Sequence, residues 1–153
     1  MDNEKFMRLA LKEAERAVKE DEVPVGAVIV IDGEIIATAH NKKEQKNDPT
    51  AHAEIEVIRK ACKKIGNWHL DKASIYVTLE PCAMCAGAIL NARIRHLYFG
   101  AWDIKAGCCG TLLDIPGDGR FNHETLITGG ILRDECAHIL SDYFKNKRMK
   151  STC

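Results

Sequence analysis

The fold of this chain is set by the stretch Ser74-Ile75-Tyr76-Val77-Thr78-Leu79-Glu80-Pro81-Cys82-Ala83-Met84-Cys85. We predict a strand over its first six residues, which are mostly apolar or β-branched, and a break at Glu80-Pro81. A helix then opens at Cys82 and runs to about Asn91. A strand followed at once by a helix is typical of α/β folds and favours parallel strand pairing. Cysteines at positions i and i+3 of a helix share one face, so both sulfur atoms can meet one metal ion.

A second piece, His52-Ala53-Glu54, supplies the rest of a candidate metal site at the start of a predicted helix. One imidazole and two thiolates, from His52, Cys82 and Cys85, suit zinc and leave the fourth tetrahedral position for water. Glu54 lies two residues from the first ligand, where its carboxylate can move protons without binding the metal. Backbone N–H groups and the positive end of the helix dipole are also available at this helix start.

The cysteine pattern by itself leaves two other interpretations open. A C-x-x-C pair can be a redox pair, or it can be half of a structural zinc site. A structural site needs a second ligand pair of similar spacing, and none is evident, although a cysteine or histidine from elsewhere can still fold in. Cys108-Cys109 are adjacent and cannot easily share one zinc, so we interpret them as packing or loop residues, and Cys62 as core. The three ligands with a nearby glutamate fit a catalytic zinc site best.

The remaining sequence predicts an α/β domain with a central mixed sheet. Apolar runs give five strands, over 25–31, 34–39, 74–79, 95–100 and 124–128. Amphipathic patterns give four helices, over 4–20, 51–64, 82–91 and 133–148. Asp32-Gly33 is a hairpin signal between the first two strands, and Asp48-Pro49-Thr50 supplies cap and start signals for the second helix. A polar loop over 40–48 and a long loop after residue 100 remain, and the length of the second is typical of functional loops.

Composition indicates a globular protein of the cytoplasm. With 153 residues, 46% of them apolar and 29% charged, the chain can bury a core as one domain over 1–153. No apolar run approaches the roughly 18 residues of a membrane span, and the charged N-terminus does not look like a signal peptide. The seven cysteines are odd in number and include one metal-spaced pair, which indicates reduced thiols in a cytosol.

The formal charges sum to zero, which does not favour general coating of nucleic acid, although their distribution matters more than their sum. The C-terminal end, 145–153, is basic, and residues 143–150 hold four lysines or arginines and no acid. Such an end is either a solvated, frayed helix end or a tail that contacts phosphates with an aromatic residue beside it.

Two motifs of this chain match known proteins. The spacing H-x-E, a gap, and then P-C-x-x-C is the signature of the zinc nucleobase deaminases, and it identifies only a superfamily. A later loop begins Phe99-Gly100-Ala101 and continues through Asp103 and Lys105-Ala106-Gly107. On these motifs the chain resembles the bacterial tRNA adenosine deaminases of the cytidine deaminase-like superfamily, and the loop favours them over guanine and cytosine deaminases. The resemblance covers nearly the whole chain, from Glu22 to the final helix.

This resemblance implies hydrolytic deamination of the wobble adenosine of a tRNA anticodon, usually in an arginine tRNA, by a homodimer with one zinc ion per subunit. It implies a three-layer α/β/α fold with a central five-stranded mixed sheet. The zinc ligands would be His52, Cys82 and Cys85, and Glu54 would be the proton shuttle. The substrate contacts that it implies are Val25, Asn41, Ala53, Asp103 and Phe144. Among these, Asp103 would accept a hydrogen bond from a ribose 2′-OH and so favour RNA over DNA.

Some of these assignments have simpler alternatives. If the family resemblance is set aside, Asn41 is interpreted as a residue that caps a loop and Asp103 as a turn residue. The family commonly has arginine where this chain has Trp102, and this tryptophan either stacks on an unpaired base or simply packs. The function has two rivals. One is a deaminase of a free nucleobase or nucleoside, which the near-neutral charge supports, and the other is a non-catalytic zinc module that binds RNA or a partner.

Overall fold

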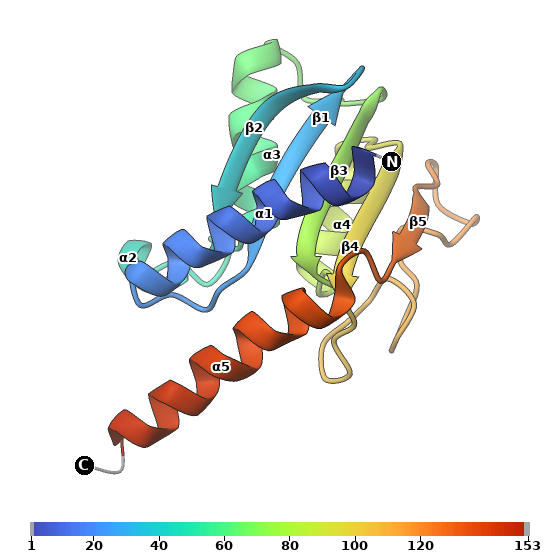
Figure 1. Cartoon of the computed structure of the whole chain (residues 1–153). Coiled ribbons are helices and arrows are strands. Elements are labelled where there is room, and N and C mark those ends of the chain that lie inside the picture. Colours follow the sequence, from blue (N-terminus) through green and yellow to red (C-terminus); the bar gives the residue numbers. More distant parts are fainter. Residues whose placement is uncertain (1, 152–153) are drawn as a thin grey trace.

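A mixed sheet forms the middle layer of the computed structural model, which describes residues 2–151 (Figure 1). Its five strands are β1 (Gly26–Ile31), β2 (Glu34–His40), β3 (Ala73–Leu79), β4 (His96–Ala101) and β5 (Leu126–Gly129). They lie in the order β2-β1-β3-β4-β5. β1 pairs antiparallel with β2 and β3, whereas β3, β4 and β5 run parallel. The expected five-stranded mixed sheet is confirmed. Cys153 and the end of the basic segment 145–153 lie outside the described residues.

Helices cover both faces of the sheet. The helices are α1 (Asp2–Lys19), α2 (Lys43–Lys46), α3 (Ala53–Ile65), α4 (Ala83–Asn91) and α5 (Arg133–Ser151). Figure 1 shows α1 and α5 in front of the sheet and α3 and α4 behind it. The alternation of β1 follows this division, because Val28 and Val30 pack in the cluster under α1 while Ala27 and Ile29 pack in the cluster under α3 and α4. The three-layer α/β/α prediction is therefore confirmed.

The packing of α1 on β1 depends on a glycine. A Cβ atom on Gly26 would lie 1.9 Å from the Ala10 carbonyl oxygen and 2.7 Å from the Ala14 backbone nitrogen. Only glycine lets the two backbones approach this closely. The small residues of α1 that face the sheet, Ala10, Ala14 and Ala17, are fully buried as a result.

Two local predictions were wrong. The segment 40–48 is not a plain loop, since it contains the one-turn helix α2, which Asn47 ends in the left-handed conformation at φ 48°. Asp48 does not cap the next helix, because its carboxylate accepts the N–H and the hydroxyl of Thr50 at 2.8 and 2.7 Å. His52 occupies the N-cap position of α3 instead, one residue before the helix begins. The side chain of His52 is thereby free to point away from the helix rather than cap it.

The fifth strand is shorter than predicted. It begins at Leu126 and not at residue 124, because Thr125 is held by other partners. The Thr125 N–H donates to the Pro116 carbonyl at 2.8 Å, and its hydroxyl donates to the Ile94 carbonyl at 2.8 Å. These contacts tie the end of the long loop to the segment that enters β4.

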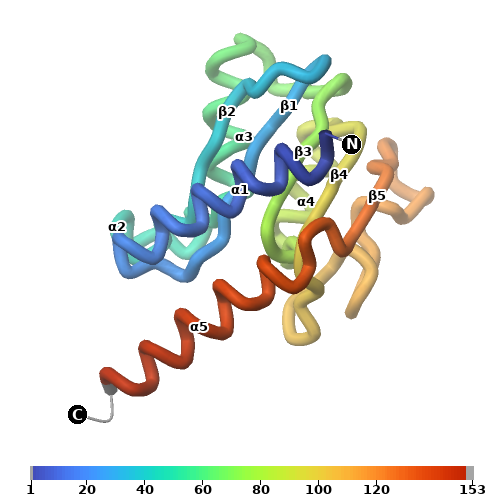
Figure 2. Tube along the Cα trace, in the orientation of Figure 1, coloured from blue at the N-terminus to red at the C-terminus, as the bar shows by residue number. Residues whose placement is uncertain are grey.

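The later turns of α5 contact the segment that follows α1. The trace in Figure 2 shows α5 following β5 and running from near the lower end of β4 to the lower left of the view, past the edge of the sheet. Tyr143 of α5 donates its hydroxyl hydrogen to Asp21, which follows α1, at 3.0 Å, and Lys147 also bonds Asp21 at 3.0 Å. Among the described residues, no helix has the length and apolar character needed to cross a membrane.

Candidate active site

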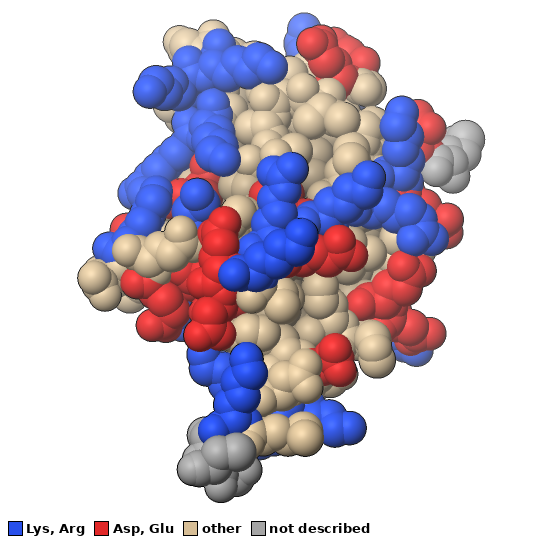
Figure 3. Space-filling view, turned by 60° about the vertical axis from the view of Figure 1, so that its left-hand side comes forward, with Lys and Arg blue, Asp and Glu red and all other residues tan. Residues whose placement is uncertain are grey.

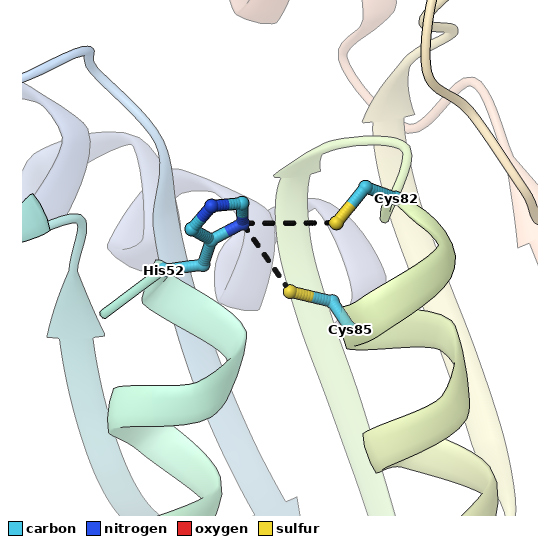
Figure 4. A group of neighbouring side chains, drawn as sticks. All are labelled: His52, Cys82 and Cys85. Atoms are coloured by element: carbon cyan, nitrogen blue, oxygen red, sulfur yellow. Dashed lines mark hydrogen bonds between the residues drawn. The ribbon is translucent and has the colours of Figure 1, made fainter. Parts of the chain in front are cut away.

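Three side chains that can hold a metal ion meet between the starts of α3 and α4 (Figure 4). His52 directly precedes α3, Cys82 directly precedes α4, and Cys85 lies in the first turn of α4. The Nδ1 atom of His52 is 3.7 Å from Cys82 Sγ and 3.5 Å from Cys85 Sγ. A tetrahedral zinc with ordinary Zn–N and Zn–S bonds sets such atoms about 3.6 Å apart, so the donors present fit this ion. The structure brings together the three residues that the motif spacing predicted.

The two thiols are electrostatically suited to a cation. Hydrogen bonds from Cys85 and from His52 lower the pKa of the Cys82 thiol to about 3 against the effect of burial. The interaction with Cys82, together with burial, raises the pKa of Cys85. The hydrogen bond with Cys82 also raises the pKa of His52. Positive charge is therefore favoured in the space between these donor atoms, where a metal ion would hold the thiolate forms.

Glu54 lies beside this cluster but is not part of it. It sits in the first turn of α3, and only 4% of its surface is exposed. Burial raises the pKa of its carboxyl to about 7. A carboxyl with a pKa near neutrality can both accept and return a proton. Among the described side chains, the group that could hold a metal ion comprises His52, Cys82 and Cys85, and the separate role of Glu54 stays a prediction.

The two helix starts contribute backbone groups to the same place. The first N–H groups of a helix lack partners within the helix and carry its positive dipole end. α3 begins at Ala53 and α4 at Ala83, directly after a donor residue in each case. Ala53, one of the predicted substrate contacts, is fully buried.

Asn41 directly follows β2, and its buried side chain is engaged by the backbone around it. Its Nδ2 donates to the Val23 carbonyl at 3.3 Å, and its Oδ1 accepts the Lys43 N–H at 3.1 Å. Its own N–H donates to the Val25 carbonyl at 3.1 Å. These contacts are those of a loop cap. The amide keeps a second N–H and a second lone pair for another partner.

A buried carboxylate that sequence reasoning missed holds this loop. Glu22 is fully buried, and its two oxygens accept the N–H groups of Glu44 and Gln45 at 2.9 and 2.8 Å. The neighbouring Lys42 N–H donates to the Ala51 carbonyl at 2.9 Å, which fixes the loop beside the residue that precedes His52. Sequence gave no local signal for Glu22, since an acid near a helix end is usually solvated.

Asp103 lies at the start of the long loop after β4 and shapes its first turn. Its Oδ1 accepts the N–H groups of Lys105 and Ala106 at 3.0 and 3.2 Å, as a turn residue does. Its own N–H donates to Glu80 Oε1 at 3.0 Å. Glu80 is buried and was interpreted from sequence only as part of a strand break. Its contacts connect Asp103 to the segment that carries Cys82.

Phe144, on the final helix α5, lies near the loop that carries Asn41. It is 42% exposed and packs edge-on against Tyr143, with ring centroids 5.5 Å apart. Together with Val23 and Gln45 it lines a surface hollow of about 460 Å³. The Val23 carbonyl accepts a hydrogen bond from Asn41 Nδ2, so Phe144 lies close to Asn41 and to the segment before β1 that carries Val25.

Trp102 and the cysteines of the long loop are mainly packing residues. Trp102 lies edge-on against Phe99, with centroids 5.4 Å apart and rings at 86°, and remains 46% exposed. Cys108 and Cys109 are buried in the core cluster, as predicted, and the Cys108 N–H donates to the Pro81 carbonyl at 2.9 Å. Cys62 is only partly buried but packs against the same cluster.

The end of α5 is basic, although the face shown in Figure 3 carries both signs of charge. Basic and acidic side chains lie side by side over the middle of this face, and basic groups gather at its upper left and at its lower end. The last turns of α5 contain Lys145, Lys147, Arg148 and Lys150, on the helix that also carries Phe144. Although the net charge of the chain is zero, the C-terminal end of α5 is therefore locally basic.

The fold and the donor cluster define a class of protein, the nucleobase deaminases with a His/Cys/Cys site. A family model described as "MafB19-like deaminase" matches residues 1–148, so the chain belongs to this deaminase family.

Within that class, the relatives that match nearly the whole chain at almost 50% identity are tRNA adenosine deaminases. A tRNA-specific adenosine deaminase of Bacillus subtilis is 49% identical over 97% of this chain and 92% of its own length. A solved structure from a study of A-to-I editing by tRNA:A34 deaminases at the wobble position is 48% identical, with a TM-score of 0.85 over 89% of this chain and 99% of that one. A guanine deaminase from Bacillus subtilis is 45% identical over 67% of this chain and 66% of its own, with a TM-score of 0.64. The predicted resemblance to tRNA adenosine deaminases is confirmed.

Proposed function

We propose that this protein hydrolyses the wobble adenosine of a tRNA anticodon to inosine, with release of ammonia. One observation carries the proposal. The His52, Cys82 and Cys85 donors and a buried Glu54 form a deaminase site in a chain about half identical, over almost its whole length, to a tRNA-specific adenosine deaminase.

In this proposal His52, Cys82 and Cys85 hold one zinc ion per subunit. Bound zinc supplies a water whose pKa is lowered toward roughly 7, and hence a nucleophile at neutral pH. Glu54 takes the proton of the water that attacks C6 of adenine and delivers it to the ring nitrogen. It then helps to protonate the leaving amino group. The buried position of Glu54, next to but outside the donor cluster, supports this role.

The proposed substrate contacts come from the segment before β1, the loops after β2 and β4, the start of α3 and the final helix α5. We assign to Asn41 and Val25 the contacts with the target nucleotide, and to the backbone N–H of Ala53, in the first turn of α3, the contact with the reacting base. Both turn hydrogen bonds of Asp103 go to Oδ1, which leaves Oδ2 to accept the ribose 2′-OH. Phe144 and the basic end of α5 contact the anticodon loop, with base stacking on the exposed ring and ion pairs to phosphates.

The remaining assignments follow the resemblance. The substrate is an arginine tRNA, the active form is a homodimer, and the enzyme works in the cytoplasm. The rival with a specific observation behind it is deamination of a free base, because a guanine deaminase is 45% identical over two thirds of the chain.

The test is an inosine assay with four substrates. The zinc-loaded protein is incubated with an arginine anticodon stem-loop and, separately, with free adenosine, cytosine and guanine. We expect inosine in the stem-loop and no turnover of the free compounds. Turnover of a free base alone would overturn the proposal, and zinc binding without any turnover would favour a non-catalytic module. Binding of the stem-loop should also weaken steeply with salt, as phosphate contacts require.

A further inference from the structure

Glu80 is a buried carboxylate that the proposed chemistry does not use. Only 2% of its surface is exposed. It stands directly after β3 and two residues before Cys82, and its N–H donates to the Ala101 carbonyl at the end of β4 at 2.8 Å. Within residues 2–151 no basic side chain forms an ion pair with it. Burying a carboxylate is costly unless hydrogen-bond donors satisfy its oxygens, so the donors around Glu80 indicate what this residue does.

All of its side-chain partners come from the loop that begins at Asp103. Oε1 accepts the Asp103 N–H at 3.0 Å and the Thr111 hydroxyl. Oε2 accepts the N–H groups of Cys109 and Thr111, both at 3.0 Å. Four donors and no acceptor face the two oxygens, which is the arrangement that an ionised carboxylate satisfies.

The loop is shaped to receive this carboxylate. A Cβ atom on Gly107 would lie 2.4 Å from Glu80 Oε1 and 2.6 Å from the Asp103 carbonyl oxygen, so the position requires glycine. Beside it the Cys108 N–H donates to the Pro81 carbonyl at 2.9 Å. The loop therefore closes over the Glu80-Pro81 segment, which leads directly into the metal donor Cys82.

We propose that Glu80 is a positioning residue that sets the distance between the metal-donor cluster and the substrate loop over 103–111. One end of this link is covalent, through Pro81 to Cys82. The other end is a set of charge-assisted hydrogen bonds to the loop that carries Asp103. A loop held in this way presents Asp103 at one fixed place relative to the reacting base, so Glu80 governs substrate binding without touching the substrate. This role rests on the proposed function, because it assigns a substrate to the loop.

The test is Glu80→Gln, which keeps size and shape but turns one acceptor into a donor that faces N–H groups. We expect kcat/KM on the stem-loop to fall roughly 10- to 100-fold, mainly through KM, with one zinc per chain retained. Amide hydrogen exchange should rise over 103–111 and stay unchanged in β1 and β3. Thr111→Val, which removes only the hydroxyl donor, should give a smaller change of the same kind.

Glu13→Gln is the matched control. Glu13 is also a buried carboxylate, but it lies on the opposite face of the sheet, where it bonds His40 at 2.7 Å and Thr38 at 3.0 Å. The Glu13→Gln variant should leave the KM for the stem-loop and the amide hydrogen exchange of 103–111 unchanged. Zinc loss, or faster exchange throughout the sheet in Glu80→Gln, would make Glu80 merely structural and overturn the inference, as would unchanged exchange and KM. If the wild type turned over no stem-loop, the proposed function would fail by itself, and the exchange and zinc measurements would still decide whether Glu80 anchors the loop.

Discussion

The metal-donor cluster and the loops around it are held in place by different means. The donors stand at the starts of α3 and α4, whose apolar residues, such as Val57 and Ile89, are fully buried in the core. The loops after β2 and β4 instead close over two buried carboxylates, Glu22 and Glu80, which accept their backbone N–H groups.

This difference separates chemistry from selectivity. The cluster depends on the packing of the whole domain, so its geometry cannot change without loss of the fold. Each loop depends on a few polar contacts, so its side chains can be exchanged while the cluster stays intact. Changes within the site should therefore sort into those that stop turnover of every substrate and those that alter only which substrate is used.

The largest effect is expected for Glu54→Gln. The amide cannot carry the proton, so kcat should fall by at least about 10²- to 10⁴-fold on any substrate. Zinc content should remain one per chain, because the donor cluster lies on other residues. The measurements are single-turnover inosine formation and metal analysis of the purified variant.

The opposite result would break the distinction between shuttle and ligands. If metal analysis found Glu54→Gln without zinc, the carboxylate would belong to the donor set, and its separate role would be lost. The matched control is Glu56→Gln on the same helix. Glu56 is also buried, and it bonds Lys46 at 2.6 Å and not the donor cluster. It should keep both zinc and turnover.

A smaller and more selective effect is expected for Asp103→Asn. Asparagine can still cap the turn through Oδ1, so zinc content and melting temperature should not change. Loss of a charged acceptor should lower the preference for ribose over deoxyribose roughly 10- to 150-fold, since such hydrogen bonds contribute roughly 1.5–3 kcal/mol. The measurement is kcat/KM on matched ribose and deoxyribose stem-loops. An unchanged sugar preference would show that Asp103 does not contact the ribose 2′-OH.

The donor residues were predicted well because a local pattern marks each piece and a known motif joins the two pieces, although His52 lies 30 residues from Cys82. Cys82 and Cys85 share a helix face by spacing alone, and the positions of His52 and Cys82 beside helix starts follow from nearby breaks. The sheet was also predictable, since apolar runs and the Asp32-Gly33 turn mark the strands. The strands and the helix starts need no knowledge of distant contacts, whereas the meeting of His52 with the two cysteines followed from the motif.

The loops were poorly predicted because their contacts are distant. Glu80 bonds Thr111, which is 31 residues away, and Glu22 bonds Gln45, which is 23 residues away. Asp48 looked like a helix cap, but its carboxylate is taken by Thr50. A usable signal did exist at Glu80, since an acid at the end of an apolar strand, beside a metal-binding motif, has to find donors inside the domain.

The smallest effect is expected at Trp102, where the sequence could not decide between stacking on a base and packing. The structure favours packing, because the indole lies edge-on against Phe99 and next to the side-chain-free Gly129 and Gly130. Trp102→Arg, which introduces the residue common in the family, should lower the free energy of unfolding by about 1 kcal/mol through loss of the ring contact. The melting temperature should fall by about 2–4 °C, while kcat/KM on the stem-loop changes only a few-fold. Trp68→Arg is the control, because Trp68 is more exposed, at 61%, and should shift the melting temperature less.

An unchanged melting temperature combined with a tenfold or greater loss of stem-loop affinity would instead assign Trp102 to base stacking, which contributes roughly 1–3 kcal/mol per base. That outcome would place the first residue of the long loop among the determinants of selectivity.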